Sequence, residues 1–102
     1  MLVDDANRLA TEITERASTG AAADQGVAAK VHVDKIQPGS VPRGAGRPTF
    51  TRYFVQVEDA TRVAMLDLDT AGTLIDEFEQ SWDADGIFDA IRARDVAVEA
   101  KQ

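Results

Sequence analysis

The chain of 102 residues contains no cysteine and only one histidine, so several kinds of chemistry are excluded at the outset. Without cysteine there are no disulfide bonds, no thiolate nucleophiles and no sulfur-ligated metals. The first five residues lack the basic stretch and apolar core of a secretory signal, and no apolar run approaches the roughly 20 residues that a membrane-spanning helix needs. We therefore expect a protein of the cytoplasm, or of a soluble assembly such as a virion, without contact with membranes.

Basic residues are scarce as well, and they are unevenly distributed. The 11 lysines and arginines face 18 aspartates and glutamates, and the net charge of −7 disfavours general binding to nucleic acids. Residues 35–57 nevertheless carry four cations and no acid, whereas residues 58–102 carry twelve acids and four cations. The protein thus combines a short cationic segment with a strongly acidic C-terminal half.

The hydrophobic pattern predicts a helix followed by strands within one domain, residues 1–102. Apolar side chains recur at steps of three and four over residues 3–18, as on the buried face of a helix. Residues 27–36 alternate between apolar and polar, as in a strand with one face in water. Two further strands, residues 50–57 and 62–68, flank a short polar turn and predict a central hairpin. The first strand can flank this hairpin or cross to its other edge.

The C-terminal third predicts two helices and a short last segment. Asp69 and Thr70 begin the first helix, and Asp83 or Asp85 caps the second. The apolar stripe of the first helix consists of Leu74, Ile75, Phe78 and Trp82. Residues 95–100 alternate again and form either an edge strand or a frayed end. The fold class is therefore α+β, with an N-terminal helix, a three-stranded and mainly antiparallel sheet around a central hairpin, two C-terminal helices and this last segment.

A long loop, residues 37–49, separates the first two strands and contains all three prolines and three of the seven glycines. Proline removes a donor from a strand ladder and glycine weakens strand order, so this stretch is irregular. It is longer than a hairpin needs, and long loops are often functional. Arg43 and Arg47 make it either a docking arm or a solvated loop, and its backbone N–H groups could also hold a phosphate or a carboxylate.

The strand that follows the loop is apolar on both faces. Phe50, Arg52 and Phe54 share one face, whereas Tyr53 and Val55 lie on the other. One face should pack against the helices, so the second face needs another cover, for which a second subunit is a candidate.

No residue set predicts a catalytic or metal site, and we expect no cofactor and no small-molecule substrate. His32 lies on the polar face of its strand, where a solvated surface histidine is the simplest interpretation. The turn at residues 83–86 has the pattern of a calcium-binding loop, but Arg92 stands where the bidentate carboxylate belongs. Asp67 and Asp69 share a strand face, as paired metal ligands do, yet no nearby histidine completes the set.

These patterns favour a non-enzymatic assembly protein that contacts copies of itself and neighbouring assembly proteins. In this hypothesis the cationic side of one copy meets the acidic helices of the next, in a head-to-tail contact that closes into a ring where the rotation permits. The cationic side consists of Arg43, Arg47, Arg52, Phe50 and Phe54. The acidic side consists of Asp76, Glu77, Glu79, Asp83 and Asp85.

The order of elements is similar to that of the tail-terminator and neck proteins of long-tailed phages. Those proteins also run from a leading helix through three strands with a long loop to a helix and a final strand. The likeness spans residues 2–100 and consists in this order, with the second short helix as an addition. It implies a protein of a viral tail or head–tail assembly that forms rings and has no active site.

Two other interpretations stay open. The acidic residues 67–89 could neutralise a basic protein partner, as immunity proteins and antitoxins do. The cationic loop could instead contact nucleic acid, although four cations reach only a few phosphates, so the binding would be weak and strongly salt-dependent.

Overall fold

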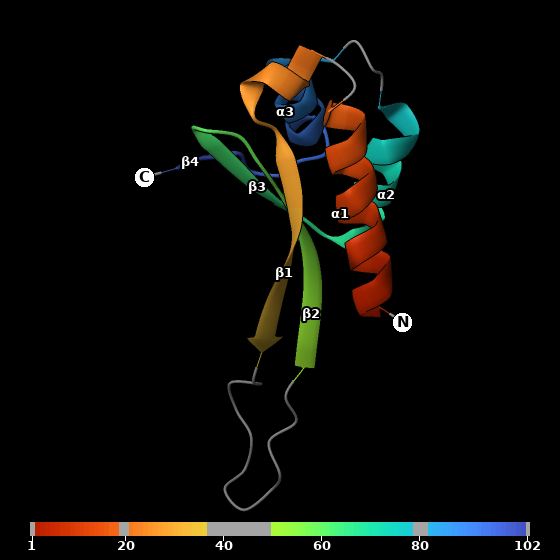
Figure 1. Ribbon diagram of the computed structural model, residues 1–102. Coiled ribbons are helices and arrows are strands. Elements are labelled where there is room, and N and C mark those ends of the chain that lie inside the picture. Colours follow the sequence, from red (N-terminus) through yellow and green to blue (C-terminus); the bar gives the residue numbers. More distant parts are fainter. Residues whose placement is uncertain (1, 19–20, 37–49, 79–81, 102) are drawn as a thin grey trace, which may run out of the picture.

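Three α-helices pack on one face of an antiparallel sheet in the computed structural model, which describes residues 2–18, 21–36, 50–78 and 82–101 (Figure 1). Among these residues the strand order is β1-β2-β3-β4, and each strand pairs antiparallel with its neighbour. The predicted α+β class is thus confirmed. The elements are α1 (Leu2–Ser18), the 3-10 helix η1 (Ala21–Gln25), β1 (Ala28–Ile36), β2 (Phe50–Glu58), β3 (Arg62–Leu66), α2 (Leu68–Glu77), α3 (Ala84–Arg92) and β4 (Glu99–Ala100).

Helix α1 is held against the sheet by one stripe of small and branched apolar side chains. Asp4 and Asp5 stand in its first turn, where their charges complement the free N–H groups of the helix end. After the helix comes η1, and Gly26 turns the chain into β1 with a φ of 74° that glycine adopts without strain. The buried positions of α1 are Ala6, Leu9, Ala10, Ile13 and Ala17.

The sheet buries its helix-facing side through cross-strand pairs of β2 and β3. Val55 lies opposite Leu66, and Val57 lies opposite Ala64. All four side chains are buried in one core with the helices. Strand β1 flanks the hairpin next to β2, which is the first of the two arrangements that the sequence left open. The largest fully buried side chains of the helices are Ile13, Leu74, Ile87, Phe88 and Ile91.

The boundary between β3 and α2 lies earlier than the sequence predicts. Strand β3 ends at Leu66, because the Asp67 side chain accepts a hydrogen bond from the Thr70 amide at 2.7 Å and caps α2. The predictions that the strand runs to Leu68 and that Asp69 begins the helix are therefore wrong. The alternation of apolar residues continues past the cap and imitates a longer strand, which concealed the start of the helix.

The two C-terminal helices also differ in detail from the prediction. Helix α2 ends at Glu77, so Phe78 and Trp82 lie beyond it, with their ring centroids 5.3 Å apart. Of the two predicted caps of α3, Asp83 is the one found, and it accepts a hydrogen bond from the Gly86 amide at 2.8 Å. The last segment pairs with β3 as β4, which confirms the strand alternative over a shorter stretch than predicted.

Replacing Asp67 by alanine tests the start of α2. The variant loses the acceptor for the Thr70 amide, so the free energy of unfolding should fall by about 1 kcal/mol, as for other lost N-caps. Asp69→Ala is the matched control, because it removes a carboxylate from the same turn without a capping hydrogen bond, and its effect should be roughly 0.5 kcal/mol or less. Urea denaturation followed by circular dichroism measures both variants, and equal losses would contradict the capping role.

Candidate functional site

The lower halves of β1 and β2 form a two-stranded ribbon that projects from the body of the protein (Figure 1). Strand β3 pairs with β2 only at residues 55–58, whereas β1 pairs with all of β2. Residues 32–36 and 50–54 therefore pair with each other and, in the described part of the chain, with no third strand. These two segments are named the distal ribbon.

One face of the distal ribbon carries a stacked cation. The guanidinium carbon of Arg52 lies 5.1 Å from the ring centroid of Phe54, and the His32 ring lies beside the same phenylalanine at a centroid distance of 6.3 Å. His32 Nε2 is 2.9 Å from Asp34 Oδ1, and Asp34 lies opposite Arg52 in the register of the two strands. These contacts hold a partly exposed ring and its neighbouring charges in one geometry, which is suited to recognition of another protein.

The structure brings together two of the residues that the sequence assigns to the cationic side. Arg52 and Phe54 are neighbours on the distal ribbon. Phe50 begins β2, but its side chain lies outside the described part, and so do Arg43 and Arg47 with the whole predicted loop. The role of the loop as a docking arm therefore stays a prediction.

The described acids assigned to the opposite side of the contact belong to α2, to α3 and to the N-cap of α3, at the end of the molecule away from the distal ribbon (Figure 1). Most of the described ones already have partners within the chain. Glu77 lies 2.8 Å from Arg94, and Asp85 lies 2.7 Å from Arg62. Asp83 serves as the cap of α3. A cation from another molecule would have to compete with these contacts.

Asp76 differs from these acids because no ion pair joins its exposed side chain to another described residue. It lines a groove of about 300 Å³ between α1 and α2, together with Asp69, Glu12 and Arg8. Three acids and one cation give this groove a negative charge. Glu79, the remaining acid of the predicted interface, lies outside the described residues. Asp76 is therefore the described acid best placed to meet a cation from another molecule.

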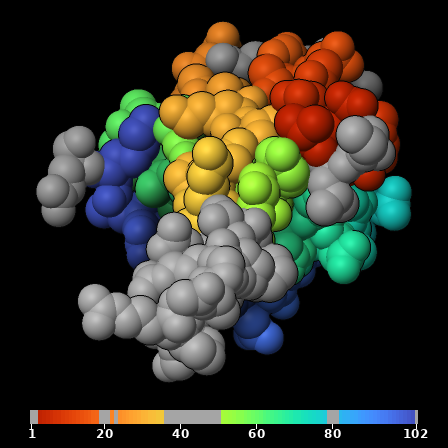
Figure 2. Space-filling view, turned by 90° about the horizontal axis from the view of Figure 1, so that it is seen from below, coloured from red at the N-terminus to blue at the C-terminus, as the bar shows by residue number. Residues whose placement is uncertain are grey.

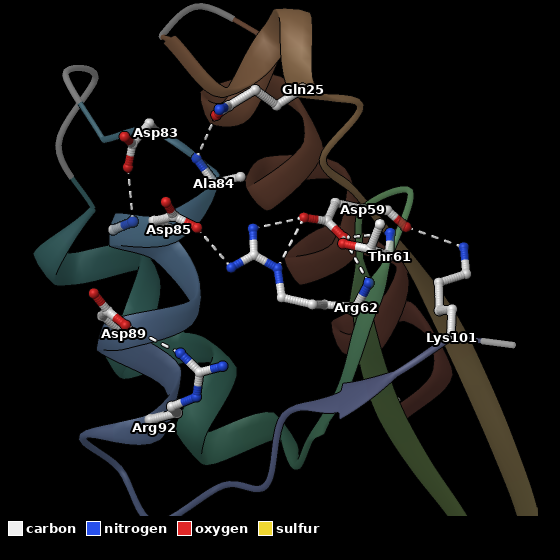
Figure 3. Close-up of polar contacts among 11 residues, drawn as sticks. Gln25, Asp59, Thr61, Arg62, Asp83, Ala84, Asp85, Asp89, Arg92 and Lys101 are labelled. Atoms are coloured by element: carbon white, nitrogen blue, oxygen red, sulfur yellow. Dashed lines mark hydrogen bonds and ion pairs between the residues drawn. The ribbon is translucent and has the colours of Figure 1, made fainter.

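A buried aspartate, which the sequence shows only as part of a polar turn, organises the other end of the sheet (Figure 3). Asp59 is 6% exposed and is the one buried charged residue among those described. Its Oδ1 accepts hydrogen bonds from the amides of Thr61 and Arg62 at 2.8 and 2.6 Å. Its Oδ2 accepts from Nε and Nη2 of Arg62 at 3.1 and 2.8 Å. These four hydrogen bonds offset the removal of the carboxylate from water.

Arg62 joins this turn to α3. Its Nη1 donates to Asp85 at 2.7 Å, and its guanidinium carbon lies 4.6 Å from the ring centroid of the buried Phe88. Near the C-terminus, Lys101 Nζ donates to the carbonyl oxygen of Asp59 at 3.1 Å. One polar network thus connects the turn, α3 and the end of β4. The turn aspartate and the arginine three residues later are visible in the sequence, but their burial depends on contacts with distant elements.

Hydrogen bonding lowers the pKa of two carboxylates at this turn, Asp59 and Glu58. Burial raises the pKa of Asp59, but hydrogen bonds from the Arg62 side chain and from the amides of Thr61 and Arg62 outweigh it, so the pKa lies below its ordinary value. Burial also opposes the charge on Glu58, whose pKa is nevertheless lowered by hydrogen bonds from Lys101 and Gln56. Because these groups already have partners, we interpret the network as structural.

Within the described ranges we find neither a membrane segment nor a metal site. No helix there is both long and apolar enough to cross a bilayer. No group of three or more histidine or carboxylate side chains there is arranged to hold a metal ion. Asp83 and Asp67, which belong to the two patterns that resemble metal sites, each cap a helix instead.

Comparison with known proteins adds no family to these observations. No protein-family model, no curated protein and no solved structure matches the chain. The function is therefore inferred from the residues and the geometry described above.

Removing the Asp59 carboxylate should destabilise the protein strongly. In Asp59→Ala the guanidinium of Arg62 loses its main partner and two amides lose their acceptor, so we expect the free energy of unfolding to fall by about 3 kcal/mol. Asp89→Ala is the control, because that carboxylate is 73% exposed and pairs only with Arg92, and its loss should cost roughly 0.5 kcal/mol or less. Urea denaturation at neutral pH distinguishes the two, and similar losses would refute a special role for Asp59.

The lowered pKa values also determine how stability depends on pH. Asp59, Glu58 and Asp67 bind protons more weakly in the folded than in the unfolded protein. Their stabilisation is therefore fully present above about pH 5 and is lost as the pH falls through the folded-state pKa values. We expect the free energy of unfolding to decrease steadily below about pH 5, and Asp59→Asn to decrease less steeply than the wild type. Urea titrations at a series of pH values measure this, and parallel curves would contradict it.

Proposed function

We propose that this protein is a non-enzymatic assembly protein that binds other proteins, and copies of itself in particular. The observation that carries the proposal is the distal ribbon, whose strands extend past β3 without a third strand in the described part of the chain. An isolated pair of strands is only marginally stable in water, so docking against another surface would stabilise this one. The stacked Arg52 and Phe54 provide an anchor of the kind that protein interfaces use.

The distribution of charge supports a head-to-tail contact. Arg52 stands on the distal ribbon, and the acids of α2 and α3 stand at the other end of the molecule (Figure 1). A cation of the ribbon would therefore meet these acids on a second copy rather than on its own chain. Asp76 is the acid that such a contact would use first, because Glu77 and Asp85 already pair with arginines. Charge matching of this kind determines register and partner choice more than affinity.

A ring is the assembly that follows from a head-to-tail contact. Such a contact uses two different surfaces, so it repeats from copy to copy and closes when the rotation between neighbours divides a full turn. The resemblance of the element order to ring-forming tail-terminator and neck proteins of phages supports the same assembly. In this form the protein would belong to a viral tail or a head–tail connection.

A second candidate is an acidic protein that neutralises a basic partner, of the immunity-protein or antitoxin type. The observation in its favour is the exposure of Glu77 and Asp85, whose side chains are 66% and 75% exposed. Their pairing with Arg94 and Arg62 makes this second candidate weaker than self-assembly. A contact with nucleic acid is weaker still, because the whole chain carries a net charge of −7.

Reversing the cationic side tests the proposal. The triple variant Arg43→Glu, Arg47→Glu, Arg52→Glu should lower the molar mass of the assembly toward that of the 11.0 kDa chain, because it places like charges at the contact. Light scattering coupled to size-exclusion chromatography measures the mass at several salt concentrations. Self-assembly that is unchanged in this variant would exclude the head-to-tail contact, and a wild-type protein that is monomeric at all concentrations would exclude self-assembly altogether.

A control of equal charge separates position from net charge. The control Arg16→Glu, Arg92→Glu reverses two cations on α1 and α3, away from the distal ribbon and from the groove at Asp76. It is compared with the double variant Arg47→Glu, Arg52→Glu, which makes the same change in total charge. The control should assemble as the wild type does. If it dissociates as far as the double variant at Arg47 and Arg52, the effect comes from overall repulsion, and the contact proposed for the cationic side is wrong.

A further inference from the structure

The outer edge of β1 carries backbone groups that point away from its own sheet. Strand β1 is the first in the order β1-β2-β3-β4, so no strand of the described part pairs with that edge. At Ala29 the amide donates to Thr14 Oγ1 of α1 at 2.9 Å, and the carbonyl accepts from the same hydroxyl at 3.2 Å. Both groups of Ala29 therefore face outward. The backbone N–H and C=O groups of successive strand residues point alternately to the two edges of the strand. Those of Val31, Val33 and Lys35 therefore face outward too.

Thr14 takes the place of a neighbouring strand at the base of β1, and further along no strand of the described part pairs with this edge. A groove of about 400 Å³ between α1 and β1 extends from Thr14 and Ala29 to Ala10, Thr11 and Val31. Figure 2 shows β1, coloured yellow to orange, at the surface beside the red α1. Ala10, Thr11 and Ala29 contribute small side chains to this lining, which also contains the longer Glu15 and Lys30. Beyond the groove, Val33 is 46% exposed, an unusual position for a branched apolar side chain.

We propose that a second copy of this chain occupies the edge, so that two β1 strands pair antiparallel about a two-fold axis through His32. This inference rests on the proposed function and names one of its contacts. An extended strand is the occupant that fits, because only another backbone offers donors and acceptors that match the outward groups of β1 along its length. The contact uses the same surface on both copies and joins their sheets into one.

The sequence of β1 is complementary to itself in this register. Val31 of each copy lies opposite Val33 of the other, as a pair whose amides and carbonyls exchange hydrogen bonds. The exposed Val33 is thereby covered at the groove of the second copy. On the other face Lys30 lies opposite Asp34 of the second copy, and opposite charges at facing positions stabilise strand pairing. Lysine at a strand edge commonly prevents pairing, so this charge match also selects one register.

The neighbouring registers fit less well. An axis through Val31 leaves one hydrogen-bonded pair, Val31 opposite Val31, because Val33 of the second copy then lies opposite Ala29, whose polar groups are satisfied by Thr14. The axis at His32 keeps two such pairs, each of Val31 with Val33. An axis through Val33 places Lys35 of the second copy opposite Val31 and brings a charge toward the apolar part of the groove. The observations therefore favour the axis at His32. Because this contact joins copies in pairs, any larger assembly should contain an even number of chains.

Proline at the edge tests the contact without breaking the sheet of one copy. The Val33 amide points away from β2, so Val33→Pro removes a donor that only a second copy would use. The dissociation constant of the pair should rise at least about tenfold, since each copy loses a hydrogen bond. Thr51→Pro is the matched control, because its amide lies on the other edge of the distal ribbon, and it should pair as the wild type does. Sedimentation equilibrium measures both, and thermal melting checks that each variant is folded.

Charge reversal provides a second measurement that contacts within one chain do not affect. Lys30→Asp and Asp34→Lys should each weaken pairing, because each places like charges opposite one another across the two-fold axis. An equimolar mixture of the two variants should pair at least about tenfold more tightly than either alone, because every facing pair is then of opposite charge. Lys30 lies 3.6 Å from Glu58 of its own chain, but mixing leaves that contact unchanged.

The outcomes separate this inference from the proposed function. If the Val33→Pro variant pairs as tightly as the wild type, the β1 contact is wrong. It is also wrong if the mixture of Lys30→Asp and Asp34→Lys pairs no more tightly than either variant alone. Loss of assembly in the variant reversed at Arg43, Arg47 and Arg52 would then still support the head-to-tail contact. A wild-type protein that stays monomeric at all concentrations overturns both. An assembly with an odd number of chains overturns the β1 contact alone.

Discussion

The length of β3 depends on the hydrogen bond between the Thr70 amide and the Asp67 carboxylate. This bond ends the strand after five residues and directs the chain into α2, so in the described part β2 has no neighbouring strand on that side beyond Val55. Had β3 continued in register, it would have paired with the rest of β2 and covered its edge. Because it stops, half of the β1–β2 hairpin lies in the body of the protein and half extends from it as the distal ribbon.

The two ends of the hairpin therefore have different roles. At the end in the body, the turn between β2 and β3 is held by the ion pair of the buried Asp59 with Arg62, and Arg62 also connects this turn to α3. There the edge of β1 is satisfied by Thr14, so the helix protects the sheet where it is packed. Farther along β1 and β2, the described residues include neither such an ion pair nor a helix side chain that satisfies the edge of β1. The strands that have left the body present backbone edges without a partner strand in the described part, and both proposed contacts use this part of the molecule.

The elements of the fold were predictable because their signals are local. The apolar stripe that includes Leu9 and Ile13 identifies a helix, and the alternation along residues 27–36 identifies a strand. Both patterns involve only residues that lie a few positions apart in the sequence. Boundaries were less predictable, since the apolar alternation through Leu66 and Leu68 competed with the cap at Asp67, and the cap prevailed. For the site, the sequence showed that Arg52 and Phe54 share a strand face, and the structure shows them stacked. The roles of Arg43, Arg47 and Glu79 remain predictions, because these residues lie outside the described part.

Much about this protein follows from its sequence alone: the α+β class, the order of its elements, and the separation of a cationic segment from an acidic half. These properties depend on periodicity and on counts of charge, which do not require knowledge of distant contacts. Only the tertiary structure decided that β1 stands at an edge, that Asp59 is buried beside Arg62, and that three of the four described acids of the predicted interface have partners within the chain. Each of these facts is set by residues far apart in sequence, and the free energy of such contacts depends on burial and geometry that no local pattern records.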